Sequence, residues 1–289
     1  MDNFTYAAFR KFLFSDRCTE HFAFLSRKEI VSLLTDPLRM EAFMCLTCIE
    51  GHLEIIADLQ VHSLHTGSLF LYLNSGLVQL KSCSEDTKCE AIVIDNEYLD
   101  EITKDKEILF LKNRNTKVNI DHHLSSHMVG NILLFQQILS SETLDSEMSY
   151  CQTMVDTLMI CYLERINQII AEKDREINLK KFHQHLPYER FIRKLTQEYP
   201  PKRKTKYYAQ EIAVVNDYLP KLVLRQTNRS IREIIGEYVT MEAKFLLHYK
   251  KLNTNTVVNR LNFPSSSAFR KYFMTYAGIS LKEYKSKKG

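Results

Sequence analysis

Residues 40 to 99 contain short apolar runs in which hydrophobic and polar positions roughly alternate, a pattern typical of β-strands. The runs are separated by turn-forming residues, namely Gly51, Gly67, the triplet 74–76 and the polar stretch 84–88. Regularly spaced short strands of this kind form small barrels or sandwiches. We predict a small β-barrel or β-sandwich in the N-terminal part of the chain.

After residue 121 the apolar spacing changes to that of helices. One helical face is formed by Leu124, Met128, Ile132, Phe135 and Leu139. A second helix is predicted over 149–174, with its apolar face at Met154, Leu158, Cys161, Tyr162, Ile166 and Ile169. It is long enough for a dimerisation helix, and the alternative is that both helices cover the barrel. A short helix that begins at 187 must end at Pro200 and Pro201, because proline cannot continue it.

The last third of the chain carries one arrangement of apolar positions twice: a short helix, a tight turn and a second helix. The inward positions are Tyr208, Ala209, Ile212, Leu219, Leu222 and Val223 in the first unit and Val257, Val258, Leu261, Phe269, Tyr272 and Phe273 in the second. Asn262 can adopt the left-handed conformation that the second turn requires, and Ser265 is a good N-cap. We interpret these as two helix-turn-helix units joined by one long helix over 230–252. A helix of about 20 residues spans ~30 Å, close to the ~34 Å between successive major-groove faces of DNA.

Composition supports two globular domains. The chain has 289 residues, of which 45% are hydrophobic and 26% charged, and it holds only 7 Gly and 6 Pro, which favours long helical elements. No run of 18 apolar residues and no signal peptide are present, so we expect a cytoplasmic protein that does not enter a membrane. The 7 Cys are expected to be free buried thiols.

The charge is divided unevenly along the chain. Residues 201–289 hold 18 Lys and Arg against 6 Asp and Glu, a net charge of +12, whereas residues 1–200 hold 21 against 29, a net charge of −8. A basic segment of this size is suited to a polyanion, because each neutralised phosphate releases condensed counterions. The tail is therefore predicted to bind nucleic acid.

The segment from about 205 to 286 resembles the DNA-binding domain of AraC-type transcriptional regulators. The matching motifs, in order, are Ala243-Lys244 with Leu246-Leu247, Leu261 with Phe263, Phe269-Arg270-Lys271-Tyr272-Phe273, and Gly278-Ile279-Ser280 with Tyr284. The resemblance covers under a third of the chain. It implies an α+β architecture: a cupin-like sensing domain over 1–120, a helical linker and candidate dimerisation region over 121–200, and an all-α DNA-binding domain over 201–289.

Three residues of the first unit depart from the family's pattern. Val215 occupies the usual Ser/Thr N-cap position and forfeits roughly 1 kcal/mol of capping. Pro220 lies one turn into the first recognition helix, where it removes a backbone N–H. Asp217 faces the direction from which DNA approaches, and phosphate repels a carboxylate there. We therefore expect the first unit to read little sequence.

The candidate DNA-contacting residues lie on the exposed face of each recognition helix. Arg and Lys donate to guanine or phosphate, and Ser donates to either class of acceptor. The predicted base-reading set is Lys221, Arg225, Ser266, Ser267, Arg270 and Lys271, and the predicted phosphate-backbone set is Lys202, Arg203, Lys204 and Lys206. The alternative is that these are solvated helix-surface residues.

Three other patterns suggest chemistry but are incomplete. Asp121-His122-His123 with His127 lacks the further Asp-rich motifs of a metallophosphoesterase, and Asp121 is predicted to cap a helix instead. Cys45 and Cys48 lack a second cysteine pair and point to opposite faces of a strand. His62 and His65 lack the spacing of metal-binding cupins. We expect no metal, no cofactor and no catalytic residues.

The sequence thus predicts a DNA-binding transcriptional regulator rather than an enzyme, with double-stranded DNA as its partner. The family resemblance also implies RNA polymerase as a partner, a homodimer and a small-molecule effector in the barrel. Two alternatives remain: a degenerate regulator that acts through protein contacts, and a cupin-fold enzyme fused to a nucleic-acid module. The enzyme needs clustered His and carboxylate ligands in the barrel, which the sequence does not offer at suitable spacing.

Overall fold

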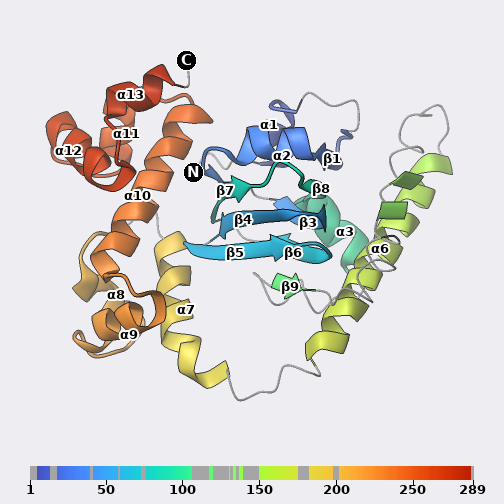
Figure 1. The fold of residues 1–289 in the computed structure, drawn as a ribbon, viewed down its shortest axis with the longest axis horizontal. Helices are drawn as coiled ribbons and strands as arrows, with labels where there is room; N and C mark the ends of the chain where they lie inside the picture. Colours follow the sequence, from blue (N-terminus) through green and yellow to red (C-terminus); the bar gives the residue numbers. More distant parts are fainter. Residues whose placement is uncertain are drawn as a thin grey trace.

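The structure, a computed structural model, has an N-terminal part of strands and helices beside a C-terminal helical part (Figure 1). It is therefore α+β, as predicted. The described residues are 5–13, 18–39, 42–57, 59–72, 76–105, 117–119, 150–174, 182–197 and 202–287, with isolated positions at 130, 133, 134, 137 and 138.

The strands form two antiparallel sheets, one in the order β1-β8-β3-β6-β9 and the other in the order β2-β7-β4-β5. Their bounds are β1 Phe22–Ser26, β2 Leu38–Arg39, β3 Ala42–Glu50, β4 His52–Ala57, β5 Gln60–His65, β6 Ser68–Tyr72, β7 Leu77–Cys83, β8 Lys88–Asp95 and β9 Lys117–Asn119. Among the described residues no strand joins one sheet to the other. The predicted barrel is therefore not closed, and the arrangement is a two-sheet sandwich.

The chain crosses from one sheet to the other at Gly51, between β3 and β4. Its φ is +83°, and a Cβ built there would lie 2.8 Å from the Thr87 Cα atom. Only glycine fits both the left-handed backbone and this close approach.

The five-stranded sheet has apolar residues on both of its faces, because successive side chains of a strand point to opposite sides. Both faces are buried. Met44, Leu46 and Val93 face the sandwich interior, while Phe43 and Ile92 face α3 (Asn96–Thr103) and α6 (Tyr150–Asp174). Two short helices, α1 (Tyr6–Arg10) and α2 (Arg27–Leu34), complete the N-terminal part. Helix α2 begins at a capping box in which Ser26 and Glu29 exchange side-chain and backbone hydrogen bonds.

Helix α6 confirms the predicted second helix but shifts its buried face. Tyr162, Ile166 and Ile169 are buried against the sheet as expected, whereas Met154 and Cys161 are exposed. Val155, Met159 and Leu163 are buried in their place. The apolar face of α6 thus covers the sheet, which was the alternative to a dimerisation role. Of the predicted helix from Leu124 to Leu139 the structure describes only positions 130, 133, 134, 137 and 138, which are helical, while Asp121, His122, His123 and His127 lie outside the described residues.

The C-terminal part consists of helices whose apolar faces share one core. Their bounds are α7 Phe182–Gln197, α8 Thr205–Glu211, α9 Tyr218–Thr227, α10 Ile231–His248, α11 Thr254–Arg260, α12 Ser266–Ala277 and α13 Leu281–Ser286. Helix α7 begins earlier than predicted and contains Pro187. It contacts α8 and α9, with the Phe191 ring edge-on to Tyr208. None of the described helices is long and apolar enough to cross a bilayer.

The segment 33–39 of the N-terminal part contacts α10 and α13 directly. Arg39 pairs with Glu242 at 2.7 Å and donates to the Tyr238 hydroxyl at 2.6 Å. The Tyr284 hydroxyl donates to Asp36 at 3.0 Å, and Tyr249 donates to the Leu33 carbonyl. Because Glu242 and Asp36 are buried, these bonds supply partners to carboxylates that would otherwise be costly to desolvate.

Candidate nucleic-acid interface

The second helix-turn-helix unit is built by α11, a five-residue turn and α12. Asn262 has a φ of 52°, the predicted left-handed conformation, and the Ser265 side chain accepts a hydrogen bond from the Ala268 N–H at 3.1 Å. Phe269 and Phe273 anchor α12 in the core. The predicted cap and turn are both confirmed, and the opposite face of α12 is left to solvent.

The exposed face of α12 carries the residues predicted to read bases. Ser267, Arg270 and Lys271 are exposed, and Ser266 is half-buried. The Ser266 hydroxyl donates to the Asn255 side chain of α11 at 3.1 Å, which fixes the start of α12 against its partner helix. The structure therefore brings all four residues to the N-terminal half of one helix, where a recognition helix contacts base edges.

The first unit is built by α8, a six-residue turn and α9. Ala213 takes the left-handed conformation here, with a φ of 56°. Leu219, Leu222 and Val223 are buried, and Lys221 and Arg225 are exposed on the other side of α9. The two predicted reading residues of this unit therefore also lie on the outer surface of its second helix.

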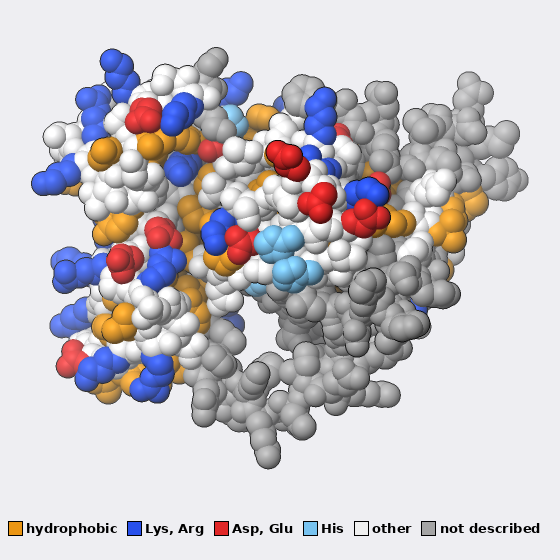
Figure 2. All heavy atoms as spheres, viewed as in Figure 1, with side chains coloured by type: hydrophobic (Ala, Val, Ile, Leu, Met, Phe, Trp, Pro, Cys, Tyr) orange, Lys and Arg blue, Asp and Glu red, His pale blue; other side chains and the backbone are white. Residues whose placement is uncertain are grey.

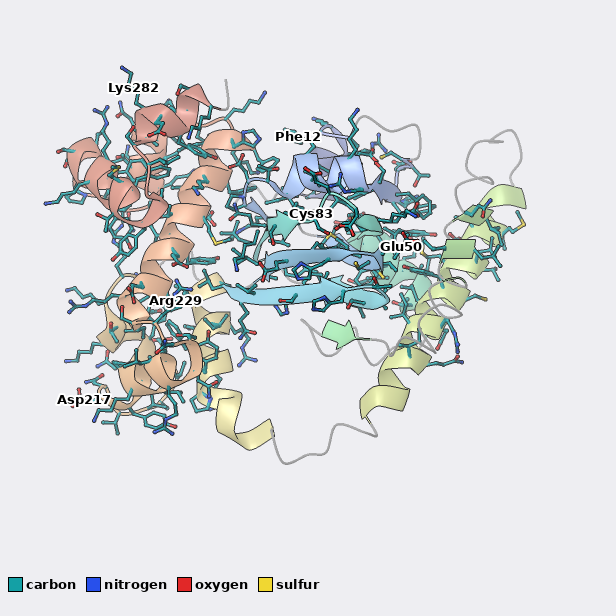
Figure 3. All side chains as sticks on the ribbon, viewed as in Figure 1. Phe12, Glu50, Cys83, Asp217, Arg229 and Lys282 are labelled. Carbon is teal, nitrogen blue, oxygen red and sulfur yellow. The ribbon has the colours of Figure 1, made fainter. Side chains whose placement is uncertain are left out.

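Two sequence-based interpretations of the first unit are wrong. The N-cap of α9 is Asp217 rather than Val215, and its side chain makes no capping bond. Pro220 is the third residue of α9, not one turn inside it. The first four N–H groups of a helix have no intrahelical partner, so this proline removes no helical hydrogen bond. Asp217 is exposed at the outer edge of the unit (Figure 3).

The two second helices repeat each other at an offset of 50 residues. The sequence of buried, half-buried and exposed positions over 223–230 is the same as that over 273–280. Each helix ends at a left-handed residue, Asn228 with φ 55° and Gly278 with φ 71°. Each is followed by a serine N-cap that accepts from a glutamate N–H, Ser230 from Glu233 and Ser280 from Glu283. The same left-handed C-cap and serine N-cap thus follow both α9 and α12, and they place the exposed faces of the two helices in equivalent positions.

Helix α10 separates the two units, which lie toward its opposite ends (Figure 1). Its 18 residues give a length of about 27 Å at 1.5 Å per residue. Gly236 sets its closest approach to α12, because an added Cβ would lie 2.2 Å from the Tyr276 ring. Helix α10 therefore sets the distance between the exposed faces of α9 and α12.

Four acidic side chains of the tail form ion pairs, whereas the exposed cations of α9 and α12 form none in the described structure. Glu211 pairs with Lys194, Glu237 with Arg229, Glu283 with Lys287 and Glu242 with Arg39. Within the described residues no ion pair involves Lys221, Arg225, Arg270 or Lys271. Figure 2 shows Lys and Arg side chains along the outer margin of both units. The unbalanced positive charge therefore faces outward.

The predicted phosphate-contacting residues do not form one group. Lys202, Lys204 and Lys206 are exposed. Arg203 instead donates to the Leu261 carbonyl at 2.9 Å and to the Asn262 carbonyl, and its guanidinium lies 4.1 Å from the centre of the Phe263 ring. Its position ties the start of the tail to the turn of the second unit, so a structural role accompanies any contact with phosphate.

The cysteine and histidine patterns lead to no described metal centre. Cys45 and Cys48 face the two different cores, as expected from a strand, and burial raises their thiol pKa values to about 12 and about 11. His65 stacks on His52, with ring centroids 4.7 Å apart, and His62 packs near Phe70. The described residues contain no group of three or more His, Cys, Asp or Glu that could hold a metal ion.

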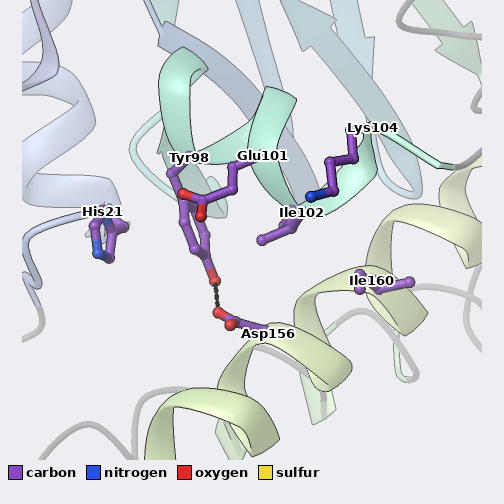
Figure 4. Close-up of a pocket in the computed structure, with 7 residues that line it drawn as sticks. All are labelled: His21, Tyr98, Glu101, Ile102, Lys104, Asp156 and Ile160. Carbon is purple, nitrogen blue, oxygen red and sulfur yellow. Dashed lines mark hydrogen bonds between the residues drawn. The ribbon is translucent and has the colours of Figure 1, made fainter.

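A pocket of about 520 Å³ opens between α3 and α6. The Tyr98 hydroxyl donates to Asp156 at 2.6 Å, and the His21 ring stacks on Tyr98 with centroids 4.6 Å apart (Figure 4). Burial and the bond to Asp156 raise the pKa of Tyr98, so its hydroxyl keeps its proton. Glu101, Ile102, Lys104 and Ile160 complete the lining. Sequence reasoning missed this pocket because its residues come from three separated segments.

No protein-family profile and no curated protein matches the chain. Among solved structures it is similar to ToxT from Vibrio cholerae, with 14% identity, 91% of this chain and 93% of that chain covered, and a TM-score of 0.42. A wild-type ToxT structure with bound unsaturated fatty acid gives 11% identity, 91% coverage of each chain and a TM-score of 0.38. The AraC-like transcriptional activator CuxR gives 13% identity, coverage of 74% and 69%, and a TM-score of 0.29.

Proposed function

We propose that this protein is an AraC-type transcriptional regulator that binds double-stranded DNA through both helix-turn-helix units. The observation that carries the proposal is the repeated exposed face: the C-terminal halves of α9 and α12 have the same burial pattern, and both helices expose cations without ion-pair partners in the described structure. A solvated helix surface with no partner would not require two such faces at opposite ends of one rigid helix.

Within this function, base reading falls to Lys221, Arg225 and the α12 set, Ser266, Ser267, Arg270 and Lys271. Phosphate contact falls to Lys202, Lys204 and Lys206, with Arg203 in a smaller part. This division follows from their places, because the first residues are on recognition helices and the lysines precede α8.

The N-terminal part is proposed to sense a small molecule. The pocket between α3 and α6 contains a histidine, a lysine and two carboxylates, so a polar ligand suits it better than an apolar one. A homodimer and contact with RNA polymerase are implied by the family resemblance and belong to the same proposal. The competing enzyme hypothesis requires His and carboxylate ligands that are clustered around a metal ion in the N-terminal part.

The direct test is to select bound fragments from random duplex DNA with the full-length protein and to titrate the best one at several salt concentrations. The logarithm of affinity should fall with the logarithm of salt by ~0.9 per phosphate contacted. Binding that ignores salt, or a selection that enriches no sequence, would favour the degenerate regulator that works through protein contacts.

A pair of variants separates reading from positioning. Replacing Ser267 and Lys271 together by Ala should relax base preference in one half of the site. Replacing Lys202, Lys204 and Lys206 by Gln should weaken all sequences about equally. If both variants lose affinity in the same sequence-independent way, the assigned roles are wrong.

A further inference from the structure

The two reading faces share an exposed apolar residue that the proposed function does not yet use. Leu224 on α9 and Met274 on α12 are related by the same 50-residue offset, and their exposed fractions are 53% and 51%. Both lie opposite the buried side of their helix. Single exposed apolar residues are common, and Val215 and Tyr218 of the first unit are exposed as well, but only Leu224 has an exposed apolar counterpart at the equivalent place in the second unit.

Each apolar residue ends a stripe along the outer face of its helix. In the first unit the stripe is Asp217, Lys221 and Leu224, and in the second it is Ser267, Lys271 and Met274, so both run at i, i+4 and i+7. These spacings place three side chains in one line on a helix. All six residues are exposed. A polar group, a lysine and a large apolar side chain are therefore presented together.

We propose that Leu224 and Met274 each contact the C5-methyl group of a thymine in the major groove. The inference rests on the proposed function and adds the base class that the two helices read. The thymine methyl is the apolar feature that base edges display in the major groove, and apolar side chains recognise it by contact. The lysine one turn earlier in each stripe supplies the charge that draws the helix toward DNA.

The arrangement suits separate methyl groups better than a protein partner. A protein interface needs a contiguous apolar patch, and its core is depleted of charge. Here each apolar side chain follows a lysine in its own stripe, and the two belong to units at opposite ends of α10. Two small targets on successive faces of one groove match that geometry.

The test uses a site selected with the full-length protein, in which each thymine is replaced in turn by deoxyuridine. This change removes only the methyl group and leaves base pairing intact. Loss of one buried methyl contact should weaken binding about fourfold at one position or more in each half-site. The Leu224→Ala variant should lose this sensitivity in one half-site, and Met274→Ala should lose it in the other.

Matched variants make the result specific. Val61→Ala removes a similarly exposed apolar side chain from β5, and it should keep the full deoxyuridine effect at both half-sites. Leu224→Met and Met274→Leu, unlike the alanine variants, should keep the loss of affinity that deoxyuridine causes. The inference is overturned if deoxyuridine has no effect anywhere, or if its effect persists in the alanine variants. Failure of the unaltered protein to bind any duplex would instead overturn the proposed function, before any variant is made.

Discussion

The first and second helix-turn-helix units share a core design but present different chemistry on the same stripe. Asp217 in the first unit corresponds to Ser267 in the second, and Pro220 corresponds to Arg270. Lys221 and Lys271 are equivalent, as are Leu224 and Met274. The comparison teaches that the buried positions fix where a reading face lies, while a few exposed substitutions decide how much it reads. The second unit has more hydrogen-bond donors and is expected to carry most of the base preference.

The largest effect should come from breaking the support that both units share. In Arg39→Met, the carboxylate of Glu242, which is 2% exposed, loses its ion-pair partner. Removing one member of a buried pair costs roughly 3 to 5 kcal/mol. We expect this loss in the free energy of unfolding, measured by urea denaturation, and weaker binding at both half-sites. The double variant Arg39→Met, Glu242→Gln should recover most of the stability.

The same variant should depend on pH in a defined direction. Burial raises the pKa of Glu242, and Arg39 opposes that rise. The folded state of Arg39→Met therefore binds a proton more tightly than the unfolded state does. Between the unfolded and the folded pKa its stability should increase as pH falls. Stability that instead increases with pH in this window would contradict a buried, unpaired Glu242.

A smaller effect on DNA binding should be confined mainly to the half-site of the second unit. Gly236→Ala places a methyl against the Tyr276 ring of the second unit, and overpacking of this kind costs roughly 1 to 3 kcal/mol. Binding at the half-site of the second unit should weaken more than at that of the first, as measured by a base-substitution scan. At Gly130 an added Cβ meets no atom within 4 Å, so Gly130→Ala is the control and should leave both half-sites unchanged.

Exchanging the polar residue of the stripe should sharpen the comparison further. A carboxylate about 4 Å from a phosphate in water costs about 1 kcal/mol, or roughly fivefold in affinity. Asp217→Ser should therefore strengthen DNA binding, and Ser267→Asp should weaken it by a similar factor. Asp217 makes no side-chain capping bond, so its replacement removes none. Equal affinities for both variants and the unaltered protein, by fluorescence anisotropy, would place this stripe away from DNA.

The smallest effect is expected at Pro220. Pro220 lies in the first turn of α9, so Pro220→Ala restores no helical hydrogen bond. The substitution removes only the rigidity that proline gives the unfolded chain. The free energy of unfolding should fall by less than about 1 kcal/mol, and base preference should not change. A marked gain in selectivity at the half-site of the first unit would show that the proline does limit that helix.

The sequence predicted the tail well because its signals are local. Asn262 and Ser265 define a turn and a cap within four residues, and the apolar spacing of α10 lies within one helix. The choice between barrel and sandwich could not be predicted, because strand partners depend on contacts between distant residues, as when Lys117–Asn119 pairs with β6. Leu224 and Met274 could be placed on helices from the sequence alone. Their equivalent, exposed positions became apparent only from the burial pattern that the two units share.

The contacts of segment 33–39 with the tail can form only late during synthesis of the chain. Arg39 and Glu242 are 203 residues apart in sequence. At about 5 to 20 residues per second, Arg39 is synthesised roughly 10 to 40 seconds before Glu242. Throughout that time the polar edge of the sandwich has no partner from the tail. If the N-terminal sheets fold before α10 and α13 emerge, their own core is what holds them together until the tail covers that edge.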